Sequence, residues 1–367
     1  MQNEGQQKEG RPKEERPKEG RQKEERQKEG QDKEKRPRVN AAIIGAGSWG
    51  TALANLLAGN GAIPCLWDID KELLESLTKH RENKKYLPGN KLHELVRVAE
   101  TREECLAGAD FVVTAVPAQH FRSTVSASLP DLPEGAFIVN VAKGIELGSL
   151  ATLSAVCSDV APGRKYIIVS GPSHAEEVAV GEPTTVTAAS ADPDAAEAVQ
   201  HIFMNERFRV YTLDDVVGVE LGGALKNVIA LGAGICDGMG YGDNTKAALM
   251  TRGIAEMARL GVSLGAKRET FFGLSGIGDL IVTCMSRHSR NRRCGIMIGK
   301  GMEAQEAITR IGMVVEGLPT ARAAKELARK AGVELPITEA ICSIISGELP
   351  PEEALTALMT REKKQEH

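Results

Sequence analysis

Two kinds of hydrophobic pattern divide the chain. Up to about Thr212, short apolar runs bounded by turn residues alternate with longer Ala- and Glu-rich stretches of helical period. Short apolar runs of this kind are typical of buried strands, and their alternation with helices indicates a mostly parallel sheet covered on both faces. The strands are expected at 39–44, 62–68, 96–99, 110–116, 136–141, 166–170, 184–188 and 208–212.

After Asp214 the alternation stops and the period becomes helical throughout. Helices are expected at 215–237, 245–264, 303–311, 320–331, 339–346 and 351–358, with 270–272 leading into a glycine turn. The pattern predicts an α/β sheet domain over 38–214, an all-helical domain over 215–360 and a C-terminal tail over 361–367. A cleft is expected between the two domains.

Residues 1–37 follow a different rule. From Gln6 they repeat in charged pentads (QQKEG, RPKEE, RPKEG, RQKEE, RQKEG, QDKEK) and contain almost no apolar side chain. A segment with nothing to bury cannot compensate the entropy of ordering, so a disordered tail is predicted. A dispensable solvated tail and a tether for an acidic surface are the two interpretations.

Composition excludes several classes of protein. With a net charge of −4 there is no basic surplus for nucleic acid. The seven cysteines are scattered without CxxC or Cys/His spacing, which argues against structural zinc and disulfides and for a reducing compartment. No uninterrupted apolar run of membrane-spanning length and no signal-peptide core is visible, so no membrane insertion and a cytoplasmic location are expected.

The first strand ends in a glycine-rich turn that opens a helix. Gly45, Gly47 and Gly50 form GxGxxG at this junction. The first glycine allows the tight turn, the second lets the backbone approach a pyrophosphate, and the third lets helix and strand pack closely. A Rossmann-type dinucleotide site is therefore predicted. The second strand ends at Asp68, where an acid would bind ribose hydroxyls and repel a 2′-phosphate, which favours NADH over NADPH.

Three later strand ends carry polar groups: TAVPAQ at 114–119, NVAKG at 140–144 and SGPSHA at 170–175. Ligands of such sheets bind beyond the carboxyl ends of the strands. Lys143 is placed to point into the crevice, and Gly171 and Ser173 offer an anion or hydroxyl site. The alternatives are a surface lysine and an ordinary capped turn.

Helix 215–237 carries a lysine among small residues. Gly222, Gly223, Lys226 and Ala230 share one stripe at helical spacing. Burial disfavours the ammonium ion, lowers the lysine pKa and makes Lys226 usable for proton transfer near neutrality. On this helix alone, a core lysine whose ammonium reaches solvent is the competing interpretation.

Two polar islands follow. The sequence 273–280 is too glycine-rich for a plain helix and is expected to deliver Asp279 into a tight turn, with a helix N-cap as the alternative. Ser289–Arg293 gathers arginines beside a hydroxyl and an amide, which suits an anionic ligand such as phosphate, or else a solvated basic loop. The stretch Val314–Gly317 returns a backbone and the carboxylate of Glu316 to the cofactor, or else it forms a core strand or helix edge.

Seven ordered motifs run along the chain. They are GAGSWGTALA (45–54), NVAKGIE (140–146), SGPSHAEEVA (170–179), GVELGGALKNVIALGAGICDG (218–238), GLSGIGDLIVTC (273–284), SRNRR (289–293) and VVEG (314–317). In these motifs the chain from about residue 39 to 360 resembles bacterial-type NAD(P)-dependent sn-glycerol-3-phosphate dehydrogenases. Only the pentad tail lies outside the resemblance.

The resemblance implies a reversible hydride transfer between NAD(P)H and dihydroxyacetone phosphate, giving sn-glycerol 3-phosphate for glycerophospholipid synthesis. It implies that Lys226 is the catalytic proton acceptor in the oxidation. The substrate would be surrounded by Lys143, Gly171, Ser173, Lys226, Asp279, Ser289, Arg290 and Asn291. The cofactor would be lined by Ser48, Trp49, Lys143, Ala175, Arg290, Val314 and Glu316.

The resemblance further implies a homodimer, and the chemistry requires no metal because a lysine polarises the ketone. Many bacterial relatives carry a basic or small residue in place of Asp68 and use NADPH, which this chain's acid disfavours. Two other functions remain open from the residues themselves. One is another two-domain β-hydroxyacid-type dehydrogenase, and the other is a non-catalytic dinucleotide sensor.

Overall fold

The computed structural model describes residues 39–363, 365 and 366, so the tail predicted over 1–37 lies outside the described residues. Val39–His367 form one compact unit. The change from sheet to helices occurs between residues 213 and 216, close to the predicted boundary. The division into two domains there stays a prediction, because the unit is continuous.

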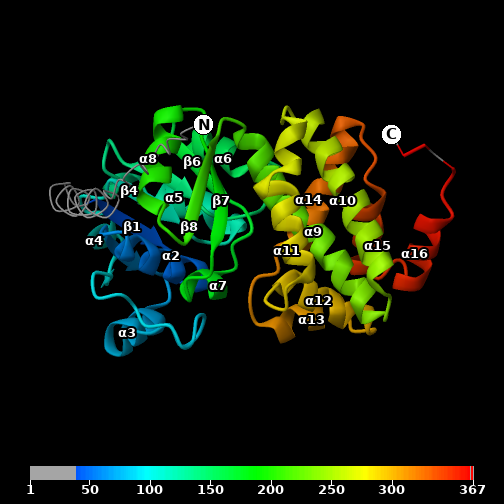
Figure 1. The fold of residues 1–367 in the computed structure, drawn as a ribbon, viewed down its shortest axis with the longest axis horizontal. Helices are drawn as coiled ribbons and strands as arrows, with labels where there is room; N and C mark the ends of the chain where they lie inside the picture. Colours follow the sequence, from blue (N-terminus) through cyan, green and yellow to red (C-terminus); the bar gives the residue numbers. More distant parts are fainter. Residues whose placement is uncertain (1–38, 364, 367) are drawn as a thin grey trace, which may run out of the picture. The chain divides into compact units, whose positions relative to one another are not determined.

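One eight-stranded sheet, in the order β3-β2-β1-β4-β5-β6-β7-β8, occupies the N-terminal part of this unit (Figure 1). Its strands are β1 Asn40–Ile44, β2 Ile63–Trp67, β3 Arg97–Val98, β4 Phe111–Thr114, β5 Phe137–Asn140, β6 Tyr166–Ser170, β7 Thr184–Ala189 and β8 Phe208–Leu213. Every neighbouring pair is parallel except β6 and β7, so β7 and β8 run opposite to the other six. The predicted α/β class with a mostly parallel sheet is confirmed.

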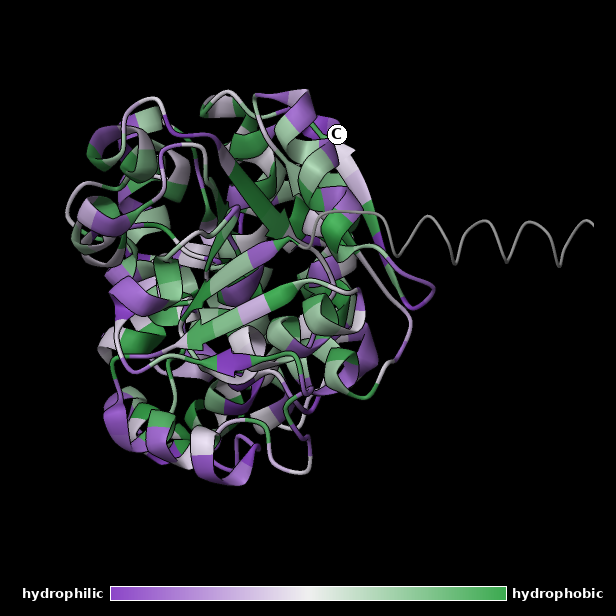
Figure 2. Cartoon of the chain, turned by 90° about the vertical axis from the view of Figure 1, so that its left-hand side faces the viewer, coloured by the Kyte–Doolittle hydropathy of each residue, from purple (hydrophilic) through white to green (hydrophobic). Residues whose placement is uncertain are grey.

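Helices cover both faces of the sheet. They are α2 Ser48–Gly59, α3 Lys71–His80, α4 Arg102–Leu106, α5 Phe121–Ser128, α6 Leu153–Val160, α7 Ala175–Ala179 and α8 Pro193–Phe203. In β1, Ala41 and Ile43 belong to one hydrophobic core and Ala42 and Ile44 to another. Because successive side chains point to opposite faces, the central strands are apolar on both. The strands in Figure 2 are mainly hydrophobic, and the hydrophilic segments lie mostly on outer helices and loops.

Past residue 215 the described chain is helical (Figure 1). Its helices are α9 Val216–Gly238, α10 Asp243–Ser263, α11 Asp279–Met285, α12 Arg290–Gly299, α13 Ala304–Ile311, α14 Gly317–Ala331, α15 Pro336–Ser346 and α16 Pro351–Met359. A 3₁₀ turn at Arg268–Phe272 and a π-helical turn at Leu274–Gly278 precede α11. The helices α11 and α12 were not predicted, because glycines and arginines obscure their apolar period.

Helix α9 is the centre of the helical part. By length and hydropathy alone it would suit a membrane span, but 89% of its most apolar window is buried inside the protein. Its N-cap, Asp215, accepts hydrogen bonds from Gly218 N, Lys267 N and Thr270 Oγ1. Helix α9 is therefore apolar because it lies in the core of the helical part, where other helices contact it on several sides.

The seam between α9 and α12 is made of glycines at four-residue spacing on both helices. A Cβ on Gly234 would lie 2.1 Å from Arg292 O, and one on Gly295 would lie 2.1 Å from Leu231 O. Gly238 and Gly299 repeat this contact one turn further along. Backbone therefore packs against backbone, and the approach draws the N-terminal end of α12 alongside the middle of α9.

Candidate functional site

The glycine turn after β1 has the form expected of a dinucleotide cradle. Gly45 has φ +108°, and a Cβ there would lie 2.6 Å from Ala115 O, in the loop after β4. A Cβ on Gly50 would lie 1.9 Å from Gly45 O, whereas one on Gly47 would meet no atom within 4 Å. The protein's own packing therefore requires the first and third glycines, while the space above the second is open.

The start of α2 faces the same space. Gly47 is its N-cap and makes no side-chain capping bond, and the first turn, with Ser48 and Trp49, contains no acid. Backbone N–H groups at an uncapped helix start attract an anion. An open cradle over Gly47 beside such a helix start fits the pyrophosphate of a dinucleotide.

Asp68 follows β2 and is bonded to the cradle itself. Its Oδ2 accepts from Ala46 N at 2.7 Å, and its Oδ1 accepts from Asp70 N at 2.9 Å. Each carboxylate oxygen has two lone pairs, so ribose hydroxyls still find acceptors there. The acid that was predicted to bind ribose and to repel a 2′-phosphate also holds the glycine turn in place.

The chemical centre is a carboxylate held between two lysines. Lys226 Nζ donates to Asp279 Oδ1 at 2.6 Å and to Thr283 Oγ1 at 2.7 Å. Lys143 Nζ donates to Asp279 Oδ2 at 2.7 Å and to Gly171 O at 2.9 Å. An ammonium group has three N–H donors, so each lysine retains one for a ligand.

Burial sets the protonation of this cluster. Lys226 is 6% exposed and Asp279 only 1%. Desolvation, assisted by the charge of Lys143 and opposed by the attraction of Asp279, lowers the pKa of Lys226 to about 8. Burial alone would raise the pKa of Asp279, but the two ammonium groups outweigh it and hold that pKa below its usual range. The interpretation of Lys226 as a lysine reaching solvent is wrong.

The backbone around Asp279 differs from the prediction. The residue does not lie in a tight turn, nor does it act as an N-cap; it begins α11, directly after a single π-helical turn. A Cβ on Gly222 would lie 2.7 Å from Ser275 O in that turn. A Cβ on Gly223 would lie 2.8 Å from Ser170 Oγ and 3.4 Å from Lys143 Cγ. The two glycines of α9 thus make room for the π turn and for Lys143.

The SGPSHA segment borders the cluster through its backbone. Gly171, at φ +146°, directs its carbonyl at Lys143 Nζ and also accepts from Ser173 Oγ at 2.9 Å. Ala175 begins α7, is buried, and packs with Trp49. The segment therefore joins the cluster to the helix that starts at the cradle.

The start of α12 lies beside Lys226 in the fold. Asn291 Nδ2 donates to Asn227 Oδ1, and Asn291 Oδ1 accepts from Gly317 N, both at 2.8 Å. Ser289 is the buried N-cap of α12 and accepts from Arg292 N. Ser289 and Asn291 thus position Arg290, whose guanidinium has no hydrogen-bond partner in the described part of the chain and senses the charges of Glu176 and Glu316.

Glu316 directly precedes α14 and lies against the loops that follow β4 and β5. Its Oε1 accepts from Ala118 N at 3.0 Å, at the start of the 3₁₀ turn Ala118–His120, while its buried Oε2 has no partner. Burial raises the pKa of Glu316. A Cβ on Gly144 would lie 3.3 Å from Oε2, so Glu316 lies against the Lys143 loop. Val314 is 44% exposed and is the one predicted cofactor residue that lies largely at the surface.

Three further residues of the site escaped the sequence analysis. Thr283 bonds Lys226, Asn227 anchors Asn291, and His174 lies near the lysines with its buried Nε2 unpartnered. Desolvation and the charge of Lys226 lower the pKa of His174 to about 4, so it is neutral. Each of the three lies close in sequence to a predicted site residue: His174 follows Ser173, Asn227 follows Lys226, and Thr283 is one turn after Asp279. This proximity is the one feature of the sequence that could have indicated them. In the part of the chain that the structure describes, no three His, Cys, Asp or Glu side chains gather as a metal site.

Comparison with known proteins decides the family. The model of the N-terminal part of NAD-dependent glycerol-3-phosphate dehydrogenases matches residues 40–196, and the model of their C-terminal part matches residues 215–356. The chain belongs to the NAD-dependent glycerol-3-phosphate dehydrogenase family. The resemblance expected from the motifs is confirmed.

Individual members of this dehydrogenase family are similar to the chain in sequence and in structure. The glycerol-3-phosphate dehydrogenase [NAD(P)+] of Carboxydothermus hydrogenoformans is 52% identical over 331 residues, covering 89% of this chain and 98% of that protein. Its counterpart from Clostridium perfringens is 49% identical over 325 residues, covering 89% and 98%. The crystal structure of glycerol-3-phosphate dehydrogenase from Coxiella burnetii superimposes with a TM-score of 0.85 at 36% identity, covering 88% of this chain and 99% of that one.

Proposed function

We propose that this chain catalyses reversible hydride transfer between NAD(P)H and dihydroxyacetone phosphate, giving sn-glycerol 3-phosphate. The single observation that supports it best is the buried Lys226–Asp279–Lys143 cluster, in which each lysine keeps one unused proton. The family assignment favours this function over a β-hydroxyacid-type dehydrogenase or a dinucleotide sensor.

Lys226 is the proton donor to the ketone oxygen in reduction and the acceptor in oxidation. With a pKa of about 8, it is mostly protonated at neutral pH yet gives up its proton readily. Lys143 stabilises the negative charge that develops on the oxygen. Its side chain is only 16% exposed, and an electrostatic interaction is stronger where little water screens it. Asp279 orients both ammonium groups, and Thr283 fixes the direction of Lys226.

Arg290 binds the substrate phosphate in this proposal. Its planar guanidinium is largely buried and unpaired, so it can form a bidentate pair with phosphate. Arg290 is held in position by the start of α12, which Ser289 caps and Asn291 anchors to Gly317. Binding energy from this remote phosphate then places the carbonyl carbon for reaction.

The cofactor supplies the hydride when bound. Gly45, Gly47, Ser48, Trp49 and Gly50 would hold its pyrophosphate, Asp68 its adenosine ribose, and Lys143, Ala175, Arg290, Val314 and Glu316 its remaining part. The orphaned Oε2 of Glu316 and the open space above Gly47 are the features that fit such a ligand. The proposal involves no metal, because Lys226 polarises the carbonyl.

Asp68 favours NADH, and this preference is testable without disturbing the cradle. We expect the ratio of kcat/KM for NADH and NADPH, with dihydroxyacetone phosphate, to exceed one. Asp68→Asn keeps an acceptor for Ala46 N–H while removing the charge that repels a 2′-phosphate, so it should raise relative NADPH use about tenfold. Strong NADPH preference in the unaltered protein contradicts the assignment, and no oxidation of either cofactor contradicts the proposed reaction.

We further propose a homodimer in the reducing cytoplasm that supplies glycerol 3-phosphate for glycerophospholipid synthesis. Free thiols at all seven cysteines support the compartment. Sedimentation velocity at micromolar concentration tests the dimer, and a monomer over that range would contradict it.

A further inference from the structure

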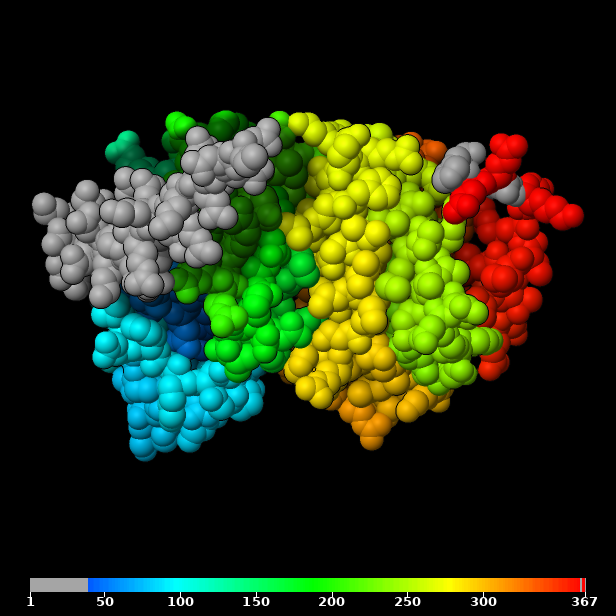
Figure 3. Space-filling model, viewed as in Figure 1, coloured from blue at the N-terminus to red at the C-terminus, as the bar shows by residue number. Residues whose placement is uncertain are grey.

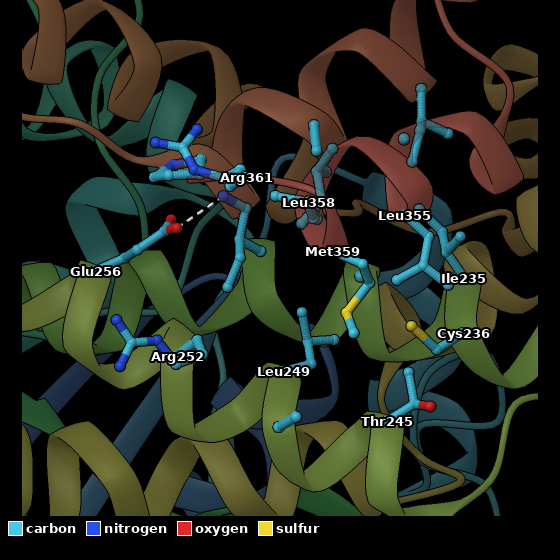
Figure 4. A pocket seen from close by; sticks show the side chains of 18 of the residues that line it. Ile235, Cys236, Thr245, Leu249, Arg252, Glu256, Leu355, Leu358, Met359 and Arg361 are labelled. Carbon is cyan, nitrogen blue, oxygen red and sulfur yellow. Dashed lines mark hydrogen bonds between the residues drawn. The ribbon is translucent and has the colours of Figure 1, made fainter. Parts of the chain in front are cut away.

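The helical part contains a hollow that none of the proposed site residues lines. It is a cavity of about 880 Å³ between α9, α10, α15 and α16 (Figure 4). Helix α16, which closes one side, lies at the outer edge of the helical part, drawn red in Figure 3. The volume is within the range of small-molecule sites, roughly 300–1,000 Å³.

The wall of the cavity is apolar along most of its length. Its aliphatic lining includes Ile235, Leu249, Ile341, Leu355, Leu358 and Met359. Met359, one of the lining residues, is 78% exposed. Apart from Asn244 and Thr245, this wall offers few neutral polar groups to orient a sugar or nucleotide, and it suits an alkyl chain.

One end of the cavity is cationic. Figure 4 places Arg252, Glu256 and Arg361 at one end and Ile235, Cys236 and Leu355 at the other. Arg259 also lines it. Arg361 pairs with Glu334 at 3.1 Å, and Arg259 donates to Glu334 O, while Arg252 has no hydrogen-bond or ion-pair partner in the described residues. Only one of the three guanidinium groups is thus paired with a carboxylate.

Glu256 offsets part of this positive charge, because the charge of Arg259 acts on its carboxylate. It is buried, and its oxygens accept from Ile337 N at 2.7 Å, Thr338 N at 3.2 Å and Thr338 Oγ1 at 3.3 Å. The carboxylate caps the start of α15 and is directed away from the guanidinium of Arg252. With three arginines and two glutamates in the lining, a formal surplus of one positive charge remains at this end.

From the apolar wall and the arginine end together, we infer that this cavity is a binding site for a single-chain amphiphile with an anionic head. The alkyl chain lies along α9 and α16, and a carboxylate or phosphate head pairs with Arg252. The site shares helix α9 with Lys226 but no side chain with the proposed reaction site, so binding and turnover are separable.

Calorimetric titration of the full chain with dodecyl phosphate, below its micelle concentration, tests the inference. We expect saturable binding of one molecule per chain. Shortening the chain by two methylenes should weaken binding about fifteenfold, since each buried methylene contributes about fourfold. Dodecanoate distinguishes a carboxylate from a phosphate source, and dodecyltrimethylammonium, with the same chain and opposite charge, should bind at least about tenfold more weakly.

Two matched pairs of variants locate the site. Ala248 and Ala247 are adjacent and exposed on α10, but only Ala248 lines the cavity. Ala248→Phe should abolish binding, and Ala247→Phe should leave it within twofold. Arg252→Gln should weaken anion binding about tenfold, whereas Arg322→Gln, an exposed arginine of α14 outside the cavity, should not.

Absence of saturable binding, equal binding by Ala248→Phe, or equal affinity for the cationic amphiphile would each overturn the inference. So would a dimer that Ala248→Phe dissociates while no amphiphile binds, because the cavity would then be a contact between two copies. Unchanged melting temperatures verify that each variant is folded.

Discussion

Helix α9 buries two charged side chains six residues apart, Glu220 and Lys226, and they are satisfied in different ways. Glu220 accepts from Ser154 N at 2.8 Å, Ser154 Oγ at 2.5 Å and Tyr166 OH at 2.6 Å, all neutral donors. Burial raises its pKa. Lys226 instead contacts an anion and a hydroxyl and keeps one donor free.

The difference separates a structural buried charge from a chemical one. The bonds of Glu220 join α9 to α6 and β6, and they leave no charge at this position for a ligand to compensate. At Lys226, two ammonium groups share one carboxylate, so the cluster carries a net positive charge until an anion or a developing alkoxide compensates it. Burial alone therefore does not distinguish the two roles. The chemical role of Lys226 is indicated by its unused proton and by the unbalanced charge of its cluster.

The largest effect is expected from Lys226→Met. It removes the proton donor but leaves Asp279 paired with Lys143, so kcat should fall about a thousandfold or more while the chain stays folded. Steady-state kinetics measures kcat, and thermal melting shows whether the variant is folded. Lys246→Met is the control, because Lys246 pairs with Asp237 outside the cluster. Turnover above a tenth of the unaltered value would remove Lys226 from its role.

Arg290→Gln should come next. Loss of a desolvated guanidinium should raise KM for dihydroxyacetone phosphate about a hundredfold, with a smaller change in kcat. Arg293→Gln, an exposed neighbour on the same helix, should leave KM within twofold. Equal KM values for the two variants would place the phosphate elsewhere.

Glu220→Ala tests the structural side of the comparison. It leaves Ser154 and the Tyr166 hydroxyl without their shared acceptor, so the free energy of unfolding should fall by about 2–4 kcal/mol. Urea unfolding measures it, and Glu220→Gln, which keeps one acceptor, should lose less. At a temperature where the variant is folded, kcat should stay within about twofold; a kcat loss comparable to that of Lys226→Met would make Glu220 part of the chemistry.

The smallest effect is the pH dependence. The pKa of Lys226 is lowered to about 8, and the ammonium form donates the proton in reduction. Hence kcat/KM for reduction should fall as pH rises through about 8, and kcat/KM for oxidation should rise over the same range. Initial rates in both directions between pH 6.5 and 9.5 measure this, and a parallel response in the two directions would contradict it.

Much of this architecture could be predicted from local pattern. Every predicted strand is present within a few residues, and the glycine turn, Asp68 and the lysine-bearing helix lie where the period and spacing placed them. Asp279 shows the limit. Its glycine-rich surroundings suggested a turn, because neither a π-helical turn nor the clearance that Gly222 provides for it leaves a periodic signal.

By itself, the sequence determined the α/β order of the elements, the dinucleotide turn and the burial of α9, because these depend on neighbours within one or two turns of chain. Only the tertiary structure decided that Lys143 and Lys226 share Asp279, across 136 and 53 residues. It also decided that the helix holding Arg290 approaches α9 through a seam of glycines. Such contacts depend on packing between distant segments, so the cluster acquires its charge balance and its spare protons only in the folded chain.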